Sequence, residues 1–325
     1  MNLTENQRLR KCLFYGRGFL EHFFVPDSLY RQQLQGKLGS LNAENQPRIS
    51  DRVRYYHKFE KLVEIPESAL RLDQLKSTNK TAYYYDFRGV MRFFPKEMRI
   101  ALRFGDVRDL SDFPRIVKTR PIHGAHENSI LLRLNSIRHF RPITDAIPYS
   151  QKIDAIVWRG KVKKDHRQTI FREHFDNPLC NLGKTNNRND GEDPRWKKPW
   201  MGIAEQLRHK FILSIEGNEV ATNLKWIAQS NSLCFMTKPK FESWFMEGRL
   251  EASKHYVELR DDYADLPEKL DHYLAHPDEA RQLISNFKTY YDQFRDPEEE
   301  LLIALLVVEK YLASTGQVSR QRADV

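Results

Sequence analysis

The sequence is poor in cysteine. Its three cysteines among 325 residues are widely spaced, which argues against a disulfide framework or a thiolate metal site. We therefore expect a reducing, cytoplasmic setting. The sequence also lacks an apolar run near the roughly 20 residues of a membrane-spanning helix, and residues 1–19 lack the apolar core of a secretory signal. A hydrophobic content of 40% with 30% charged residues instead indicates a soluble globular protein.

Several catalytic and nucleotide-binding motifs are also missing. The chain contains no G-x-G-x-x-G fingerprint, no G-x-S-x-G elbow, no H-E-x-x-H and no C-x-x-C. Gly183, Lys184 and Thr185 match the end of a P-loop, but Pro178 occupies the position of its first glycine. There is no Asp-x-Asp pair to hold a divalent ion on a diphosphate. A diphosphate bound here would need Arg, Lys and a helix N-terminus, and we expect no metal and no cofactor.

The chain is basic, with a net charge of +9 that either attracts an acidic partner or serves solubility. Nucleic acid, an anionic membrane surface and a phosphorylated substrate are the three candidate partners. The basic residues are spread along the chain and nucleic-acid-binding motifs are missing, so we expect no nucleic acid. A phosphorylated substrate and a peripheral contact with an anionic membrane remain.

The length favours two domains of about 150 residues each. Pro142 and Pro148 frame a segment that suits a linker, and we place the boundary there, between residues 1–148 and 149–325. In the first domain we expect a helix over residues 6–24 and strands over 81–88, 99–104 and 116–122. In the second we expect strands over 154–158, 211–215, 233–236 and 255–259, helices over 166–175 and 241–250, an exposed loop over 178–199 and three C-terminal helices. Strands that alternate with helices predict an α/β fold with a parallel sheet.

Residues 211–236 predict a strand, a tight turn, a helix and a second strand. Glu216 and Gly217 punctuate the first strand, and Asn218 can cap a helix that runs to residue 229. Open α/β sheets bind ligands at the carboxyl ends of their strands, and a helix N-terminus there attracts phosphate. Further donors would come from Thr222, Asn223 and Lys225. The alternative is a plain structural crossover, and the pattern alone does not decide between the two.

Two other strand ends carry polar residues. The strand at 154–158 is followed by Arg159, Gly160 and Lys161. Arg167 comes next in a predicted helix, an order that also suits phosphate, although a solvated loop is the alternative. Asp106 follows another strand and Gly105, so it lies at the sheet edge where catalytic groups of α/β enzymes gather. Its alternative role is to cap the next turn.

Four groups of segments stand out when the chain is taken in order. They are F-G-D with I-V-K-T-R-P-I, then V-W-R-G-x6-R, then S-I-E-G-N-E-V-A-T-N-L-K-W, and finally F-E-S-W-F-M-E-G with H-Y-V-E-L. Together they resemble glycosyltransferase family 90, over residues 99–275. The combination is specific, although each piece alone is weak. The chain looks most similar to the bacterial lipopolysaccharide-biosynthesis branch, with fungal capsule-associated proteins and animal protein O-glucosyltransferases more distant.

The resemblance implies a GT-B architecture, in which two Rossmann-like domains face each other across a cleft. It also implies metal-independent transfer from a UDP-sugar that the second domain holds. Asp106 matches the proposed base of the animal relatives, and its carboxylate would take the proton from the acceptor hydroxyl. Inversion at the anomeric carbon is implied as well.

The resemblance further assigns residues to the donor site and the cleft. Arg167 resembles a diphosphate-binding arginine, and Lys161 falls on a nearby hydroxyl-bearing position. A second phosphate-binding arginine aligns with Asn223, so the missing charge has to come from elsewhere, and Lys225 is our candidate. Glu242 would accept hydrogen bonds from the ribose, or would serve as a helix-start acid. The cleft would be lined from the first domain by Lys118 and Arg120.

We therefore expect a glycosyltransferase that moves a hexose, glucose or galactose, from a UDP-sugar to the lipopolysaccharide or lipooligosaccharide core. Inner cores carry phosphate and acid groups on an anionic membrane, which suits the net charge of +9. Two alternatives remain open. One is a capsular or other surface-polysaccharide acceptor, and the other is a non-catalytic basic binding protein on the same scaffold.

Overall fold

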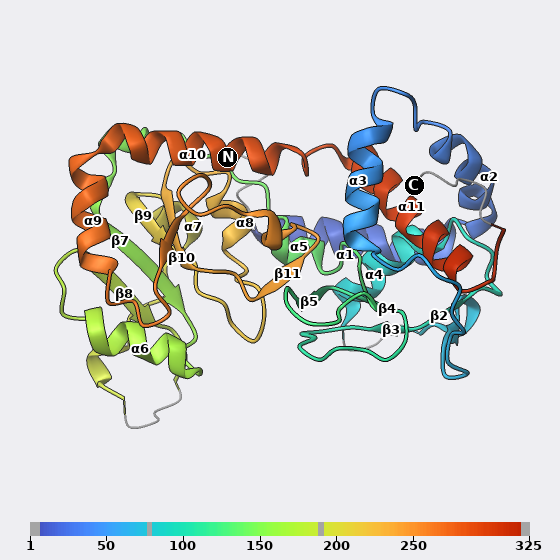
Figure 1. Cartoon of the computed structure of the whole chain (residues 1–325), viewed down its shortest axis with the longest axis horizontal. Coiled ribbons are helices and arrows are strands. Elements are labelled where there is room, and N and C mark those ends of the chain that lie inside the picture. The colour runs from blue at the N-terminus through green and yellow to red at the C-terminus, as the bar shows by residue number, and fades with distance from the viewer. Residues whose placement is uncertain (1–6, 77–79, 188–191, 320–325) are drawn as a thin grey trace.

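The structure is a computed structural model that describes residues 7–76, 80–187 and 192–319 (Figure 1). Its helices are α1 (Gln7–Phe24), α2 (Asp27–Leu38), α3 (Gln46–Tyr56), α4 (Thr81–Met91), α5 (Ser136–His139), α6 (Asp165–His174), α7 (Ile203–Gln206), α8 (Leu224–Ile227), α9 (Leu266–Ala275), α10 (Pro277–Asp292) and α11 (Pro297–Ser314). Its strands are β1 (Leu70–Arg71), β2 (Arg99–Ile100), β3 (Leu102–Arg103), β4 (Arg115–Val117), β5 (Thr119–Pro121), β6 (Ser129–Leu131), β7 (Ile153–Gly160), β8 (Cys180–Lys184), β9 (His209–Leu213), β10 (Leu233–Thr237), β11 (Phe241–Ser243) and β12 (Val257–Leu259). None of the described helices is long and apolar enough to cross a membrane.

The C-terminal half is built on a five-stranded sheet that is parallel throughout, in the order β12-β10-β9-β7-β8. Helix α6 connects β7 to β8, and α9 and α10 follow β12, so helices surround the sheet in the left half of Figure 1. From β7 the chain turns first to β8 on one side and later to β9 on the other. The carboxyl ends of β7 and β9 therefore form a topological switch point, where doubly wound sheets bind their ligands. The predicted α/β fold with a parallel sheet is confirmed.

The two faces of this sheet belong to different apolar clusters, as the two-residue period of a strand requires. Phe211 and Phe235 lie on one face, in a cluster confined to the C-terminal half. Ile212 and Cys234 lie on the other, in a cluster that continues through Trp244 into the N-terminal half. The apolar core therefore runs from one half of the molecule into the other.

The N-terminal half contains a smaller parallel sheet, in the order β3-β4-β6. Strand β11 follows β10 in the chain but pairs antiparallel with β5, which places Glu242 opposite Arg120. Helix α11 packs against α2, α3 and α4 on the right side of Figure 1. Asp296 caps it, accepting from the backbone N–H of Glu298 at 2.9 Å. Two segments beyond residue 148 are thus built into the first half, and the domain division at that residue stays a prediction.

Three predicted elements are wrong for local reasons, and a fourth, the helix at residues 218–229, is described with the candidate site. The predicted strand at residues 81–88 is helix α4, because Tyr83, Phe87 and Met91 recur at helical spacing and are buried together. The predicted helix at 241–250 is strand β11 and a 3₁₀ turn, since Met246 has a left-handed φ of 54°. The predicted loop at 178–199 contains β8, the edge strand of the larger sheet.

Candidate active site

The carboxyl end of β3 places Asp106 where the two halves meet. Gly105 precedes it with a φ of 109°, a left-handed conformation that suits glycine, and a Cβ there would strike Lys80. One carboxylate oxygen of Asp106 accepts a hydrogen bond from Lys118 Nζ at 3.1 Å, and the other accepts from Asn218 Nδ2 at 3.1 Å. Because Asn218 lies just after β9, this carboxylate is held by donors from both halves.

Lys118 links Asp106 to a second acid. Its Nζ lies 2.6 Å from Glu219 Oε1, and both of these side chains are buried. Burial raises the pKa of Glu219, against the opposing effect of Lys118. For Lys118 burial acts in the lowering direction, but Glu219 and Asp106 outweigh it and its pKa is raised. The lysine therefore stays charged between two carboxylates and fixes their positions. We call this meeting point of the two halves, formed by Asp106, Lys118, Asn218 and Glu219, the junction.

The side chain of Asp106 is 39% exposed. Burial acts to raise the pKa of its carboxyl, but Lys118 and the hydrogen bond from Asn218 outweigh that effect and lower the pKa. The carboxylate is therefore ionised at neutral pH, the state that a general base requires. Its exposed side is where a substrate hydroxyl could approach.

Arg167 crosses the switch point of the larger sheet. From α6 its guanidinium donates to the carbonyl oxygens of Ile215 and Glu216, each at 2.9 Å, and of Lys161 at 2.8 Å. A Cβ on Gly217 would lie 3.3 Å from its Nη2. Burial lowers the pKa of Arg167 to about 10, so it remains charged at neutral pH. Among the described residues no carboxylate pairs with it, and this cation at the carboxyl edge is suited to an anionic ligand.

Glu216 joins two loops at the same edge. Its Oε1 accepts hydrogen bonds from the backbone N–H groups of Lys240 at 3.1 Å and Phe241 at 3.2 Å. Burial raises the pKa of Glu216 to about 7. The loop after β9 is therefore tied to the loop after β10 by a carboxyl group that titrates near neutrality.

Known proteins resemble most of this chain. Residues 132–295 match the model of Glycosyl transferase family 90. The O-glucosyltransferase LpsA of Dichelobacter nodosus is 43% identical over 272 residues, which cover 83% of this chain and 85% of that protein. The chain belongs to glycosyl transferase family 90. Both the family and the enzyme class expected from the sequence are confirmed. Protein O-glucosyltransferase 3 of Homo sapiens is 23% identical over 164 residues, 49% of this chain and 32% of that protein.

The other predicted donor residues after β7 have different surroundings in this family 90 chain. Arg159 turns toward the edge strand β8 and donates to the backbone and side-chain oxygens of Asn181 at 2.6 and 2.8 Å. Gly160 lies under the indole of Trp158, where a Cβ would come within 2.5 Å of the ring. The Lys161 side chain is exposed, and its carbonyl oxygen binds Arg167. Arg167 is thus the predicted cation that reaches the switch point.

The predicted helix at residues 218–229 is much shorter, which is a correction. Only α8 is helical, and Asn223 precedes it, binding the Leu213 carbonyl at 2.9 Å through its Nδ2. The segment before α8 stays irregular because Asn218 and Glu219 reach across to the first half. Thr222 lies in the turn before α8. The expected long helix with its N-terminus at residue 218 is therefore absent from these described residues.

Lys225 and Glu242 are buried in closed ion pairs. Lys225 Nζ contacts Glu247, and both side chains are almost fully buried. Glu242 accepts from Arg120 Nε at 2.7 Å and from the Tyr55 hydroxyl. These contacts occupy the ammonium group of Lys225, which was predicted to bind phosphate, and the carboxylate of Glu242, which was predicted to bind ribose. Those two roles remain predictions that the described contacts do not support.

Two residues of the junction were not recognised as site residues in the sequence. Asn218 was expected to cap a helix, and Glu219 was not singled out. The available signal was their place directly after Gly217, at the end of a strand whose neighbour, β7, also ends in polar residues. Only the three-dimensional structure shows that this turn faces Asp106, through the hydrogen bond from Asn218.

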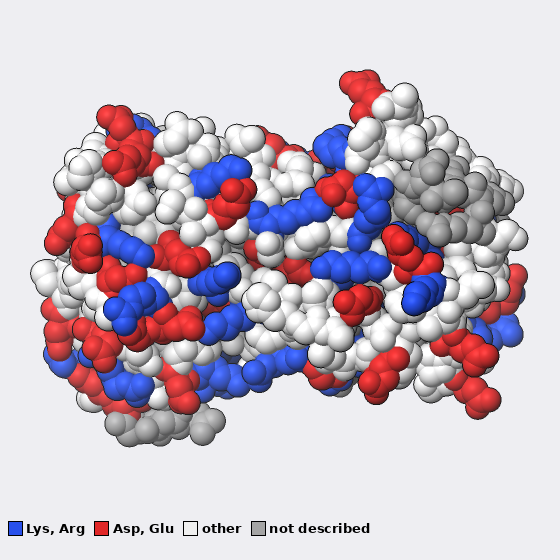
Figure 2. Space-filling model, viewed as in Figure 1, with Lys and Arg blue, Asp and Glu red and all other residues white. Residues whose placement is uncertain are grey.

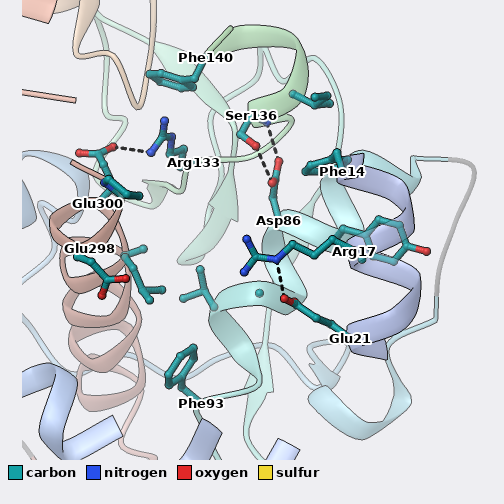
Figure 3. Close-up of a pocket in the computed structure, with 18 of the residues that line it drawn as sticks. Phe14, Arg17, Glu21, Asp86, Phe93, Arg133, Ser136, Phe140, Glu298 and Glu300 are labelled. Atoms are coloured by element: carbon teal, nitrogen blue, oxygen red, sulfur yellow. Dashed lines mark hydrogen bonds and ion pairs between the residues drawn. The ribbon is translucent and has the colours of Figure 1, made fainter. Parts of the chain in front are cut away.

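A metal ligand set and a cavity lie outside this site. His272, His276 and Glu279 have ligand atoms within 4.8 Å of one another, at the exposed outer corner between α9 and α10. A cavity of 620 Å³ lies between α1, α4, α5 and α11 (Figure 3), and it does not include Asp106 or Arg167. Neither feature alters the assignment of the junction.

Proposed function

We propose that this family 90 glycosyltransferase moves a hexose from a UDP-sugar to the lipopolysaccharide or lipooligosaccharide core. The observation that carries the proposal is the position of Asp106, an ionised and partly exposed carboxylate held between donors of both halves. Glucose is favoured over galactose by the name of the similar bacterial O-glucosyltransferase. We also propose that the two halves are the two facing domains of a GT-B enzyme.

The donor diphosphate would bind at the switch point of the larger sheet. Arg167 supplies a charge there, and ligand oxygens could replace the carbonyl groups that it now contacts. The turn after β9 brings backbone groups to the same edge. No step in this scheme uses a metal ion, in keeping with the missing Asp-x-Asp motif.

The transfer would be a single displacement. The acceptor hydroxyl gives its proton to the Asp106 carboxylate while its oxygen forms a bond to the anomeric carbon. The bond from that carbon to the diphosphate breaks, and UDP leaves with the electron pair. Arg167 stabilises the charge that develops on the diphosphate. Attack opposite the leaving group inverts the anomeric carbon.

The acceptor is expected to be anionic. Lys and Arg side chains lie along the narrow middle of the molecule in Figure 2, where the two halves join. Together with the net charge of +9, they would attract a phosphorylated core and the anionic membrane face that carries it. We place the enzyme in the cytoplasm, at the inner face of the inner membrane.

A donor and acceptor screen tests the proposal. Purified protein is incubated with UDP-glucose or UDP-galactose and with defined core saccharides, and the products are identified by mass. We expect hexose transfer to a core acceptor that persists in a chelator. Transfer only to capsular oligosaccharides would show that the acceptor is a capsular polysaccharide and not the core. Strict dependence of transfer on Mn²⁺ would contradict the donor site described above. No turnover with any donor, together with salt-dependent binding alone, would favour a non-catalytic protein.

A further inference from the structure

Helix α1 carries an apolar face whose large side chains are exposed. At 3.6 residues per turn, an arc of about 120° contains only apolar and cysteine side chains or glycine. The side chains of this arc are Leu9, Cys12, Leu13, Phe19, Leu20 and Phe23. Phe19, Leu20 and Phe23 are 50%, 57% and 64% exposed. Such a concentration of large apolar side chains on one helix face marks an interaction site.

The opposite side of α1 fixes which way this face points. Phe14 packs edge-on against Tyr85 with ring centroids 6.3 Å apart, and Gly18 lies so close that a Cβ would be 2.6 Å from the Tyr85 ring. Glu21 binds Arg17 at 2.6 Å and Arg92 at 3.3 Å. Figure 3 shows Phe14, Arg17 and Glu21 beside the cavity that α1 shares with α4. Because these contacts hold the inward side, the apolar arc is turned away from the protein.

The charges beside the arc are positive. Arg8 and Lys11 lie on one side of it, and Arg17, which is exposed but paired with Glu21, borders the other. The single acid of α1 is Glu21, which lies on the inward side. A helix with an apolar face, aromatic side chains and basic borders is suited to the interface of an anionic bilayer. A second copy of the chain would bring basic borders together, whereas anionic headgroups complement them.

We propose that α1 docks this protein on an anionic phospholipid surface, with the apolar arc in the headgroup layer and the basic side chains on the lipid phosphates. Each apolar side chain of the arc gains from leaving water. Each basic side chain near the surface adds attraction that salt weakens. The net charge of +9 adds to it at longer range.

Docking through α1 would also bring the junction to the membrane. Tyr15 of α1 lines a cavity of 360 Å³ together with Lys80 and Tyr83. Lys80 binds the Phe104 carbonyl just before Asp106, and the Tyr83 ring lies 5.6 Å from Lys118 Nζ. The helix is therefore a neighbour of the Asp106 network. That an acceptor anchored in the same bilayer would reach Asp106 rests on the proposed function, but the docking itself does not.

Vesicle sedimentation tests the docking. The full chain is mixed with vesicles of phosphatidylglycerol and phosphatidylcholine, or of phosphatidylcholine alone, and the bound fraction is measured. The variant Phe19→Ser/Leu20→Ser/Phe23→Ser should partition at least about tenfold more weakly. Replacing Arg8 and Lys11 with glutamine should weaken binding to the anionic vesicles about fivefold for each charge that is lost. This difference in binding should vanish at high salt. The control is Leu62→Ser/Trp200→Ser, which alters side chains that are 79% and 73% exposed elsewhere.

Cys12 offers a second readout on the apolar arc. It is exposed, whereas Cys180 and Cys234 are buried, and burial raises the pKa of Cys180 to about 12. An environment-sensitive fluorophore on Cys12 should shift to shorter wavelength on anionic vesicles, and a water-soluble quencher should then reach it less. An unshifted signal at saturating vesicle concentration would overturn the proposal.

Other outcomes separate the docking from the chemistry. Equal binding of the wild type and the triple serine variant overturns the assignment of α1. The protein could instead form a dimer that the triple serine variant abolishes, without binding vesicles. That result would show that the apolar arc binds a second copy of the chain, and it would also overturn the proposal. Transfer to a water-soluble core acceptor should be unchanged in the triple variant. If transfer fails while vesicle binding follows the expected pattern, the proposed function falls and the docking stands.

Discussion

Lys118 and Arg120 are two residues apart, both are buried, and both bind an acid from the other half of the chain, yet their surroundings differ. Arg120 is enclosed by Glu242 and by backbone carbonyl groups, including that of Ser129 at 2.9 Å. Lys118 also touches the partly exposed Asp106. The closed pair can only hold the halves together, whereas the open network also presents a carboxylate to a substrate. Similar charge pairs can therefore differ in role according to whether one member reaches solvent.

The largest expected effect comes from the open network. Asp106→Asn keeps the shape of the side chain and one acceptor oxygen but removes the base, so kcat should fall by roughly 10³-fold. UDP affinity and thermal unfolding should change little. Turnover by mass detection and UDP titration by calorimetry measure the two effects. Asp112→Asn, on an exposed residue of the following loop, is the matched control, and full activity of Asp106→Asn would rule out the base.

Breaking the closed pair of Arg120 and Glu242 should lower the stability of the protein. Arg120→Met leaves Glu242 buried without its cation, which should cost about 3–5 kcal/mol in the free energy of unfolding. The double variant Arg120→Met/Glu242→Leu removes both charges and should recover a large part of this loss. Urea unfolding followed by circular dichroism gives the values. A double variant as unstable as the sum of its single variants would show that the pair is not a closed unit.

A smaller effect is expected at the switch point. Arg167→Ala removes the charge that we assign to the diphosphate, and a lost hydrogen bond to a charged group should weaken UDP binding by about 10- to 100-fold. Arg172→Ala, on the same helix and exposed, serves as the control. Unchanged UDP affinity in Arg167→Ala would argue against its phosphate role.

The smallest effect concerns Glu216. Burial raises the pKa of its carboxyl group from 4.5 to about 7. The folded chain holds this proton more tightly than the unfolded chain, so the stabilisation is complete below pH 4.5 and is lost as the pH rises through 7. The loss should be on the order of 1–2 kcal/mol, after allowance for solvent access. Glu216→Gln should flatten this part of the pH profile in urea unfolding. Glu97→Gln, an exposed carboxylate, should leave it unchanged.

Hydrophobic spacing predicted much of the larger sheet and of the C-terminal helices. The strands at 154–158, 211–215, 233–236 and 255–259 are all present because buried strands give short apolar runs. The prediction failed at α4, where the tyrosine-rich composition suggested a strand although the spacing of the buried residues is helical. It also could not show that β11 leaves its own half to pair with β5. Pairing between distant segments leaves no local signal.

The candidate site was predictable where position along a strand decides it. Asp106 and Arg167 follow strand ends, and both lie at a carboxyl edge in the structure. Lys225 lies in α8, and its partner Glu247 comes after β11. Glu242 lies in β11, and its partner Arg120 comes from β5. No local pattern predicts either pairing. Whether a charged side chain faces a substrate or a buried counter-charge depends on such partners. The phosphate and ribose roles of these two residues therefore depended on the resemblance alone.

The packing of α11 has a consequence for the order in which the protein can fold. This helix comes last in the described chain, yet Ile303 and Tyr311 are buried in the core of the first half, where the Tyr311 hydroxyl accepts from the Ala101 N–H at 3.0 Å. A nascent chain on the ribosome therefore lacks one wall of its first half until synthesis has passed α11. The C-terminal sheet, whose strands all lie between residues 153 and 259, can form earlier. The half that is translated first is completed last.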